Sequence, residues 1–266
     1  MSSSPIGIFD SGVGGVSVLR EVQRELPHED LLYAADSAHA PYGDKPAEVI
    51  TARTFAVVDF LIGQGAKAIV IACNTATGIA VDALRRERQV PIVAIEPAIK
   101  PAVAMTRSGV VGVLATSGTI ASSRFASLLE RVAGPARVIP QACPGLVEEI
   151  ERGAFHSQKT RALVEQYVRP LVDQGADALV LGCTHYPLIA DVIADVAGPG
   201  VQVIDPAAAV AQELQRQLES RGLLADVSRA GSLRVFSTGP SAALRDVLAR
   251  LGVEANDVRE IALSVG

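Results

Sequence analysis

The 266-residue chain contains no tryptophan, and aromatic residues make up only 4% of it. Hydrophobic residues nevertheless account for 49% of the sequence, with alanine, valine and leucine the most frequent among them. Small aliphatic side chains of this kind are typical of buried parallel strands covered by helices. The composition therefore favours a globular α/β protein with one large domain or two of ordinary size.

An excess of positive charge is also missing. Lysine and arginine number 24 against 29 aspartates and glutamates, and the net charge is −5. No basic stripe marks a site for nucleic acid or anionic lipid. No apolar run is long enough to span a bilayer, and residues 1–6 lack the regions of a signal peptide. We expect a cytoplasmic protein with no nucleic-acid or membrane partner.

Only three cysteines are present, an odd number that does not make a disulfide framework. In a reducing compartment each cysteine is either a small buried apolar residue or a working thiol. The sequence around each cysteine has to decide between these two roles.

Short runs of isoleucine, valine and leucine alternate with stretches whose apolar residues recur at three- and four-residue spacing, as in 46–61 and 160–173. This alternation predicts parallel sheets with helices on both faces. The expected strands are Ile6–Phe9, Leu31–Ala35, Ala66–Ala72, Pro91–Ile95, Val110–Ala115, Ala136–Ile139, Asp177–Gly182, Val201–Ile204 and Leu233–Ser237.

One segment of the chain is repeated. Residues 64–73 read QGAKAIVIAC and residues 174–183 read QGADALVLGC, with six of the ten positions identical. Each copy predicts a helix end followed by a buried strand that stops at a cysteine, Cys73 or Cys183. The sequence therefore indicates two similar α/β domains related by pseudo-twofold symmetry.

A proline-punctuated segment, IEPAIKP at 95–101, separates the two copies. We place the second domain at 98–206 and the first at 1–97, completed by 207–266, which is too short for a third domain. The predicted fold class is α/β, with two similar domains that each contain a mainly parallel sheet flanked by helices. The active site is expected between the two domains.

Ligands of open α/β sheets bind where the strands end. Two sheet edges that face each other would place Cys73 on one wall of a cleft and Cys183 on the other. Inverting a tetrahedral carbon requires one group that removes a proton and a second that delivers one to the opposite face. Thiols suit both tasks because their ordinary pKa is about 8.5. The matched positions favour racemisation over two buried core cysteines.

Two further residues are candidate helpers. Asp10 ends the first expected strand and would orient or deprotonate Cys73, or else cap the turn that follows. His185 lies two residues after Cys183 and would share its wall, or else form a structural hydrogen bond. The loops at these strand ends contain no arginine or lysine but many hydroxyl, amide and backbone N–H groups. Such groups bind carboxylates, so we expect a small polar ligand.

Three other site types deserve comparison. A glycine-rich turn after the first strand suggests a dinucleotide-binding module, but Ser17 replaces the third glycine and Asp10 would repel a pyrophosphate. Cys73, Cys183 and His185 could together bind zinc, although the repeat matches only the cysteines. A pyridoxal-dependent enzyme is disfavoured because no lysine lies at an expected strand end. We expect neither a metal nor a cofactor.

Five motifs carry a resemblance to a known family, in the order GIFDSGVGG (7–15), APYGD (40–44), ACNTAT (72–77), LATSGTI (114–120) and LGCTHYP (181–187). Together they are similar to the glutamate racemase family, within the aspartate/glutamate racemases. The resemblance implies two aspartate-racemase-like domains and cofactor-independent interconversion of L- and D-glutamate for peptidoglycan. An aspartate or hydantoin racemase on the same scaffold is the nearest alternative.

The same resemblance implies roles for individual residues. Cys73 would act on the D-enantiomer and Cys183 on the L-enantiomer, and Cys143 would be structural. Members of the family often dimerise, so glutamate and a second copy of the chain are the expected partners. The implied substrate contacts are Asp10, Ser11, Tyr42, Gly43, Asn74, Thr75, Thr116, Thr119, Thr184 and His185.

A helper glutamate is also implied, on the Cys183 side. The segment CPGLVEEIE at 143–151 matches a family pattern whose last residue, Glu151, would pair with His185. Glu148 and Glu149 lie in the same segment, so the sequence leaves the register open. The implied catalytic set is Cys73, Cys183, Asp10, Glu151 and His185.

Overall fold

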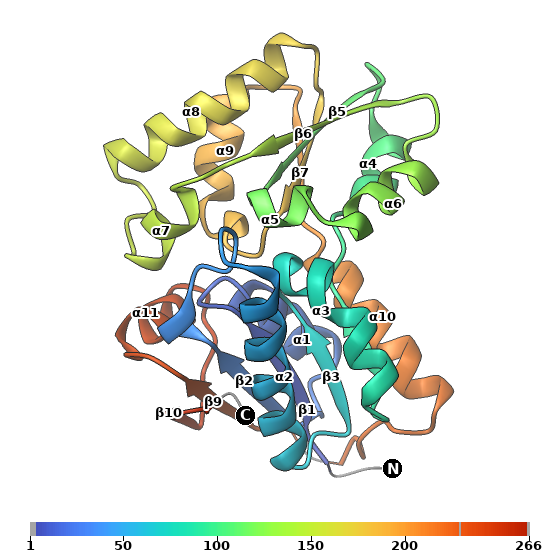
Figure 1. Ribbon diagram of the computed structural model, residues 1–266, viewed down its shortest axis with the longest axis vertical. Coiled ribbons are helices and arrows are strands. Elements are labelled where there is room, and N and C mark those ends of the chain that lie inside the picture. Colours follow the sequence, from blue (N-terminus) through green and yellow to red (C-terminus); the bar gives the residue numbers. More distant parts are fainter. Residues whose placement is uncertain (1–3, 229, 265–266) are drawn as a thin grey trace.

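The structure is a computed structural model that describes residues 4–228 and 230–264. Two parallel sheets lie one above the other, and each is covered by helices (Figure 1). The first sheet has the strand order β10-β9-β2-β1-β3-β4. Its strands are β1 (Ile6–Asp10), β2 (Leu31–Ala35), β3 (Ala68–Ile71), β4 (Ile92–Ala94), β9 (Leu233–Ser237) and β10 (Asp257–Glu260).

The second sheet has the strand order β6-β5-β7-β8. This order repeats the β2-β1-β3-β4 part of the first sheet, with β5 in the place of β1 and β7 in the place of β3. The repeated sequence segments therefore form equivalent strands in the two halves. The strands of the second sheet are β5 (Val110–Ala115), β6 (Arg137–Ala142), β7 (Ala178–Gly182) and β8 (Gln202–Ile204).

Successive side chains of each strand point to opposite faces, so each buried sheet needs a helix layer on both sides. In β1, Ile8 packs with α1 (Val16–Glu25), whereas the next residue, Phe9, packs with α2 (Ala47–Gly63). The other helices of the first half are α3 (Asn74–Glu87), α10 (Ala207–Ser220) and α11 (Ala242–Arg250).

The second half follows the same plan. Val113 of β5 packs on the side of α6 (Ser123–Val132), and Leu114 packs on the side of α8 (Gln158–Asp173). The remaining helices of this half are α4 (Ile99–Met105), α5 (Ser117–Ile120), α7 (Leu146–Glu151) and α9 (Ala190–Ala197).

These sheets confirm the predicted fold class, and every expected strand is present with its ends shifted by a few residues at most. One strand was not predicted. β10 reads DVRE and lies at the edge of the first sheet, where it pairs with β9 alone. Its side chains are half-buried or exposed, so it lacks the continuous apolar run that marks a buried parallel strand.

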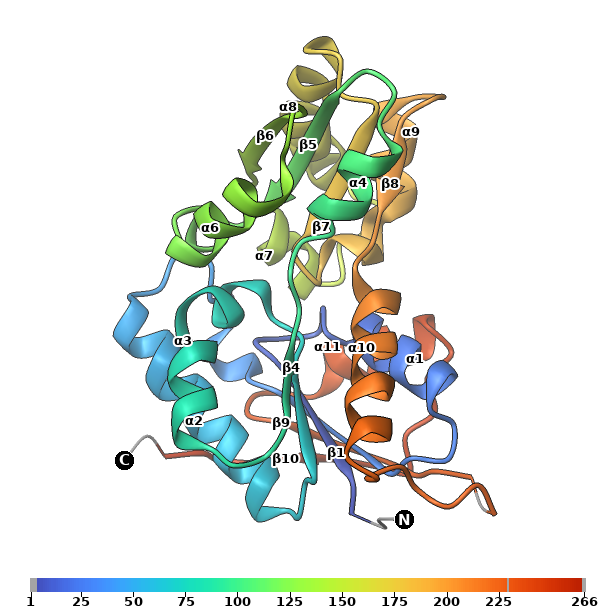
Figure 2. The ribbon, with the colours of Figure 1, turned by 90° about the vertical axis from the view of Figure 1, so that its right-hand side faces the viewer.

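The chain passes from the first half to the second between β4 and α4, and it returns between β8 and α10 (Figure 2). The division into 1–97 with 207–266 and 98–206 stays our proposal for the domain limits. No helix among the described residues is long and apolar enough to cross a membrane.

Candidate active site

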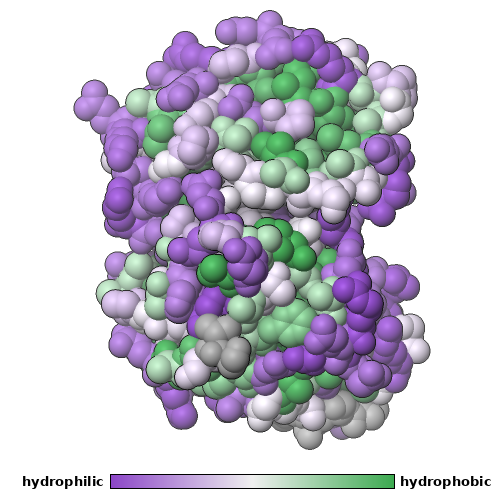
Figure 3. Space-filling view, in the orientation of Figure 1, coloured by the Kyte–Doolittle hydropathy of each residue, from purple (hydrophilic) through white to green (hydrophobic). Residues whose placement is uncertain are grey.

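A small cavity lies between the two halves, where strands of both sheets end. The outline of the molecule narrows at this level (Figure 3). The cavity has a volume of about 260 Å³ including its open mouth. Its lining residues are Ser11, Pro41, Tyr42, Gly43, Cys73, Asn74, Thr75, Thr116, Val147, Cys183, Thr184 and His185.

Both repeated cysteines therefore line the same cavity, one from each half. Three of the residues singled out from the sequence, Asp10, Thr119 and Glu151, do not line it and lie behind the lining. Pro41 and Val147 line it without having been predicted. Apolar residues of this kind carry no chemical signal in a sequence, and only their position in the fold brings them to the site.

Cys73 lies two residues after the end of β3 and caps the N-terminus of α3. Its sulfur accepts a hydrogen bond from the N–H of Ala76 at 3.4 Å and donates one to the Ser11 hydroxyl at 3.5 Å. Burial raises the pKa of Cys73 to about 12, with the negative charge of Asp10 acting in the same direction. At neutral pH this thiol keeps its proton and is ready to donate it.

Cys183 follows β7 and has a different neighbour. Its sulfur lies 3.7 Å from Nδ1 of His185, and Nε2 of that histidine lies 2.6 Å from Oε1 of Glu151. Burial lowers the pKa of His185, but the hydrogen bonds with Cys183 and Glu151 outweigh it and hold the pKa well above its ordinary value. A protonated imidazole beside a sulfur atom stabilises a thiolate.

The structure also distinguishes the three neighbouring glutamates. Glu151 reaches His185, whereas Glu149 accepts hydrogen bonds from Arg152 at 2.7 Å and Lys159 at 2.8 Å. Burial raises the pKa of Glu151, but the hydrogen bond from His185 outweighs it and the pKa is lowered. Glu151 is thus the carboxylate that pairs with the histidine, in the register that the sequence had left open.

The glycine-rich turn after β1 makes room for this pair. The N–H of Val13 donates a hydrogen bond of 2.9 Å to Oε1 of Glu151. A Cβ atom on Gly12 would stand 1.8 Å from that oxygen, and one on Gly14 would stand 2.5 Å from Nδ1 of His185. The turn therefore serves close approach of residues from the other half. From the sequence alone we could only compare it with a nucleotide-binding turn.

Asp10 is fully buried at the end of β1. Its carboxylate accepts hydrogen bonds from the N–H of Gly12 at 3.0 Å and from the hydroxyl of Thr184 at 3.1 Å. Burial raises its pKa, and the charge of His185 partly offsets this effect. Within the described parts of the chain, no hydrogen bond joins Asp10 to Cys73. The carboxylate holds the turn and the opposite wall together.

Hydroxyl groups connect the two walls on the Cys73 side. Oγ1 of Thr75 lies 2.9 Å from Oγ1 of Thr116 and 3.3 Å from Oγ1 of Thr119. Thr75 belongs to α3 of the first half, and the other two residues belong to the start of α5 in the second half. Thr119 thus supports the cavity wall from behind.

Asn74 has a buried side-chain amide whose nitrogen and oxygen have no hydrogen-bond partner within the described structure. Leaving such a group unsatisfied costs about 1–3 kcal/mol. Asn74 lines the cavity, so a polar ligand would supply the missing partners. Within residues 4–228 and 230–264, no group of three or more His, Cys, Asp or Glu side chains is arranged to hold a metal ion.

The fold and the cleft together define a class of protein, in which two parallel β-sheets covered by helices enclose a small cavity with one thiol on each wall. Comparison with known families agrees with this description. The Asp/Glu/Hydantoin racemase family matches residues 6–214, and the chain belongs to this family. The resemblance inferred from the five motifs is thereby confirmed.

Individual relatives narrow the comparison. The glutamate racemase of Methylococcus capsulatus is 55% identical over 237 residues, covering 89% of this chain and 88% of that protein. The crystal structure of a glutamate racemase isoform from Bacillus anthracis superimposes with a TM-score of 0.90 at 34% identity and covers 100% of both chains. Escherichia coli glutamate racemase, solved in complex with L-glutamate, gives a TM-score of 0.84 at 32% identity and covers 98% of this chain and 99% of that one.

Proposed function

We propose that this protein is a glutamate racemase that interconverts L- and D-glutamate without a cofactor and so supplies D-glutamate for peptidoglycan. The observation that carries the proposal is the pair of buried thiols, Cys73 and Cys183, on facing walls of one small cavity. The names of the most similar relatives support glutamate as the substrate in preference to aspartate or a hydantoin.

In the L-to-D direction, the Cys183 thiolate removes the proton from the α-carbon. The Cys73 thiol then delivers its proton to the opposite face of the same carbon. One C–H bond breaks and one forms, so Cys183 ends as a thiol and Cys73 as a thiolate. The D-to-L direction reverses these roles, and the free protein is poised for L-glutamate because burial keeps Cys73 protonated.

The surroundings of the two sulfurs favour this cycle. The His185 cation stabilises a thiolate at Cys183, while Glu151 fixes the imidazole and keeps it charged. A thiolate at Cys73 would face the carboxylate of Asp10, so it should recover a proton readily once the product has left. The N–H groups at the start of α3 and the amide of Asn74 are suited to hold the substrate carboxylates.

Two sequence-based expectations accompany this proposal. A cytoplasmic location is expected from the sequence. A homodimer is expected from the family, and sedimentation of the purified protein would measure it.

The test is circular dichroism of L- and D-glutamate incubated with the protein and no added cofactor. The signal of each enantiomer should decay to zero, and in deuterium oxide the product should carry solvent deuterium at the α-carbon. Cys73→Ala and Cys183→Ala should each lose this turnover and remain folded. Cys143→Ala is the matched control, since Cys143 is equally buried but its sulfur bonds to the carbonyl of Gln141.

Full turnover by either single variant of the pair would exclude the two-thiol mechanism. If the circular dichroism signal changes with aspartate and not with glutamate, the protein is an aspartate racemase that uses the same two-thiol mechanism.

A further inference from the structure

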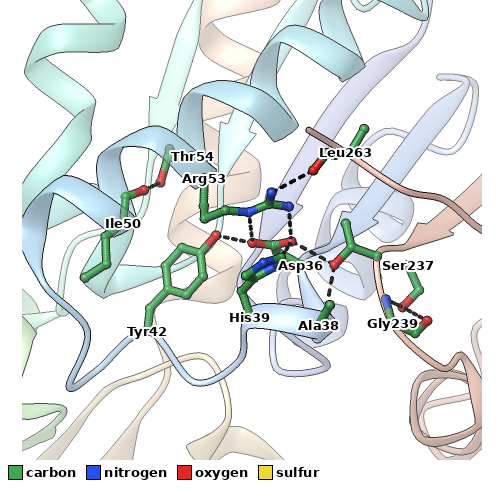
Figure 4. A network of polar contacts seen from close by, with 11 residues as sticks. Asp36, Ala38, His39, Tyr42, Ile50, Arg53, Thr54, Ser237, Gly239 and Leu263 are labelled. Carbon is green, nitrogen blue, oxygen red and sulfur yellow. Dashed lines mark hydrogen bonds and ion pairs between the residues drawn. The ribbon is translucent and has the colours of Figure 1, made fainter. Parts of the chain in front are cut away.

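A buried carboxylate lies beside the cavity but outside it. Asp36, which follows β2, is fully buried and accepts hydrogen bonds from several side chains (Figure 4). The hydroxyl of Tyr42 donates at 2.6 Å and the hydroxyl of Thr238 at 2.7 Å. Arg53 of α2 donates from Nε at 3.0 Å and from Nη2 at 2.7 Å, and Nδ1 of His39 lies 3.1 Å away.

Arg53 is itself 3% exposed, and it uses its remaining terminal nitrogen elsewhere. Nη1 donates a hydrogen bond of 2.8 Å to the carbonyl of Leu263, near the end of the chain. The planar guanidinium forms a bidentate contact with the Asp36 carboxylate through two nitrogens. Such a contact fixes the orientation of both groups as well as the distance between them. The pair therefore joins α2, the end of β2 and the segments that follow β9 and β10 into one rigid unit.

One of the groups held by this unit belongs to the cavity wall. Tyr42 lies in the loop 40–46, which we call the substrate loop, and both Tyr42 and Gly43 line the cavity. The Tyr42 ring is buried, and its hydroxyl points toward Asp36 (Figure 4). The first half of the protein thus holds the substrate loop through this hydroxyl.

The next residue of the substrate loop contacts the second half. The carbonyl of Gly43 accepts a hydrogen bond of 2.9 Å from the N–H of Gly118 in α5. A Cβ on Gly118 would lie 2.7 Å from that carbonyl oxygen, and one on Gly43 would lie 3.0 Å from Cβ of Thr116. The loop and α5 are therefore in close contact across the cavity, so a small displacement of Tyr42 would break the contact at Gly43.

We propose that Asp36 and Arg53 are positioning residues, which set Tyr42 and through it the Gly43–Gly118 contact that closes the cavity over its substrate. This inference rests on the proposed function and deepens it. Neither residue lines the cavity, so both act through the substrate loop. Asp36 and Arg53 therefore set the fraction of the free protein in which the substrate loop is closed.

The expected consequence is a change in KM that kcat does not share. If the closed loop is less populated, the apparent affinity for substrate falls by the same factor, while bound substrate still draws the loop closed. Arg53→Met should raise the KM for glutamate roughly 10- to 100-fold, the range expected for weakening the one charge-assisted hydrogen bond between Tyr42 and Asp36. The kcat should stay within about threefold of the wild-type value.

Matched variants separate this role from general stability. Lys67 forms a buried ion pair with Glu29, at 2.6 Å and with both side chains no more than 5% exposed. This pair lies at the amino ends of the strands, on the side of the sheet remote from the cavity, since Lys67 precedes β3 and Cys73 follows it. Lys67→Met should lower the melting temperature and leave KM unchanged. Arg53→Lys keeps the charge but loses the two-pronged contact, so its KM should lie between those of the wild type and Arg53→Met.

A double-mutant cycle tests whether Arg53 acts through the tyrosine hydroxyl. Tyr42→Phe removes that hydroxyl and leaves the Asp36–Arg53 ion pair in place. In the Tyr42→Phe background, Arg53→Met should add less than about twofold to KM, because the connection is already broken. Independent, multiplicative effects of the two changes would overturn the proposal.

Hydrogen exchange supplies a readout that does not depend on turnover. The amide of Gly118 donates to the substrate loop, so it should exchange at least about tenfold faster in Arg53→Met than in the wild type or in Lys67→Met. If the Gly118 amide exchanges at the wild-type rate in Arg53→Met, Arg53 does not control the position of the substrate loop. If the amide exchanges faster but KM is unchanged, the loop position does not affect substrate binding. If the wild-type protein does not racemise glutamate, the proposed function is refuted. The hydrogen-exchange experiment would still test whether Arg53 positions the substrate loop.

Discussion

Replacing Glu151 by glutamine tests the series of contacts that runs from Glu151 through His185 to Cys183. The substitution keeps the size and the hydrogen-bonding capacity of the side chain but removes its charge. Oε1 of Glu151 contacts Nε2 of His185 at 2.6 Å and the N–H of Val13 at 2.9 Å. The glutamine oxygen can still accept one of these bonds, so the local structure should persist. What is lost is the carboxylate that keeps the imidazole protonated.

The size of the effect follows from the contact that is weakened. A hydrogen bond to a charged partner contributes about 1.5–3 kcal/mol, and each 1.36 kcal/mol is a factor of ten. The Glu151 side chain is 17% exposed and that of His185 is 2% exposed, so solvent screening is weak. We expect kcat/KM for glutamate to fall roughly 10- to 150-fold, measured by circular dichroism.

The same variant should shift the pH profile in a defined direction. Burial lowers the pKa of His185, and the contacts with Cys183 and Glu151 raise it well above its ordinary value of 6.5. Without the Glu151 charge that pKa falls, so the imidazolium is lost at a lower pH. The alkaline limb of kcat/KM should therefore move toward lower pH in Glu151→Gln.

Glu149→Gln is the control for this prediction. It makes the same chemical change on the same helix, but Glu149 bonds to Arg152 and Lys159 and does not line the cavity. Its kcat/KM and pH profile should match the wild type within about twofold. Equal losses in both variants, or an unaltered pH profile in Glu151→Gln, would refute the role assigned to Glu151.

Two further predictions concern packing and stability. Gly14→Ala places a Cβ 2.5 Å from Nδ1 of His185, so kcat/KM should fall at least about 100-fold, and normal activity would show that the turn is not in close contact with the histidine. Burial raises the pKa of Asp177, but hydrogen bonds from Thr106, Ser108 and the N–H of Arg107 outweigh it and lower the pKa to about 2. Its stabilising effect is therefore complete above the ordinary value of 3.8 and is lost as the pH falls through about 2. The difference in melting temperature between the wild type and Asp177→Asn should shrink from about pH 4 to about pH 2, and a constant difference would contradict this account.

Much of the site could be predicted because strand ends are local features of a sequence. An apolar run that stops at a polar residue marks the edge of a sheet, and parallel strands bring such edges together. Cys73, Asn74, Thr75, Cys183 and their neighbours were found in this way. Asp36 and Arg53, which hold the substrate loop from behind, could not be found in this way, because most of their partners lie far away in the sequence.

Arg53 illustrates the second kind. It lies in α2, and its two partners, Asp36 and the carbonyl of Leu263, are 17 and 210 residues away. Nothing in the local sequence distinguishes it from an exposed arginine. Its burial follows from the return of the C-terminal segment to the first sheet, where β9 and the unpredicted β10 complete the edge beside β2.

The sequence by itself determined the two-sheet architecture and the pairing of Cys73 with Cys183, because hydrophobic periodicity and the ten-residue repeat are properties of the chain alone. It named Asp10 as a helper of Cys73 and His185 as the neighbour of Cys183, but it could not give the distances between these groups. Only the tertiary structure places the Asp10 carboxylate near one sulfur and the His185–Glu151 pair beside the other. Protonation depends on burial and on charges brought close in space, and these distances are decided by how the two halves meet.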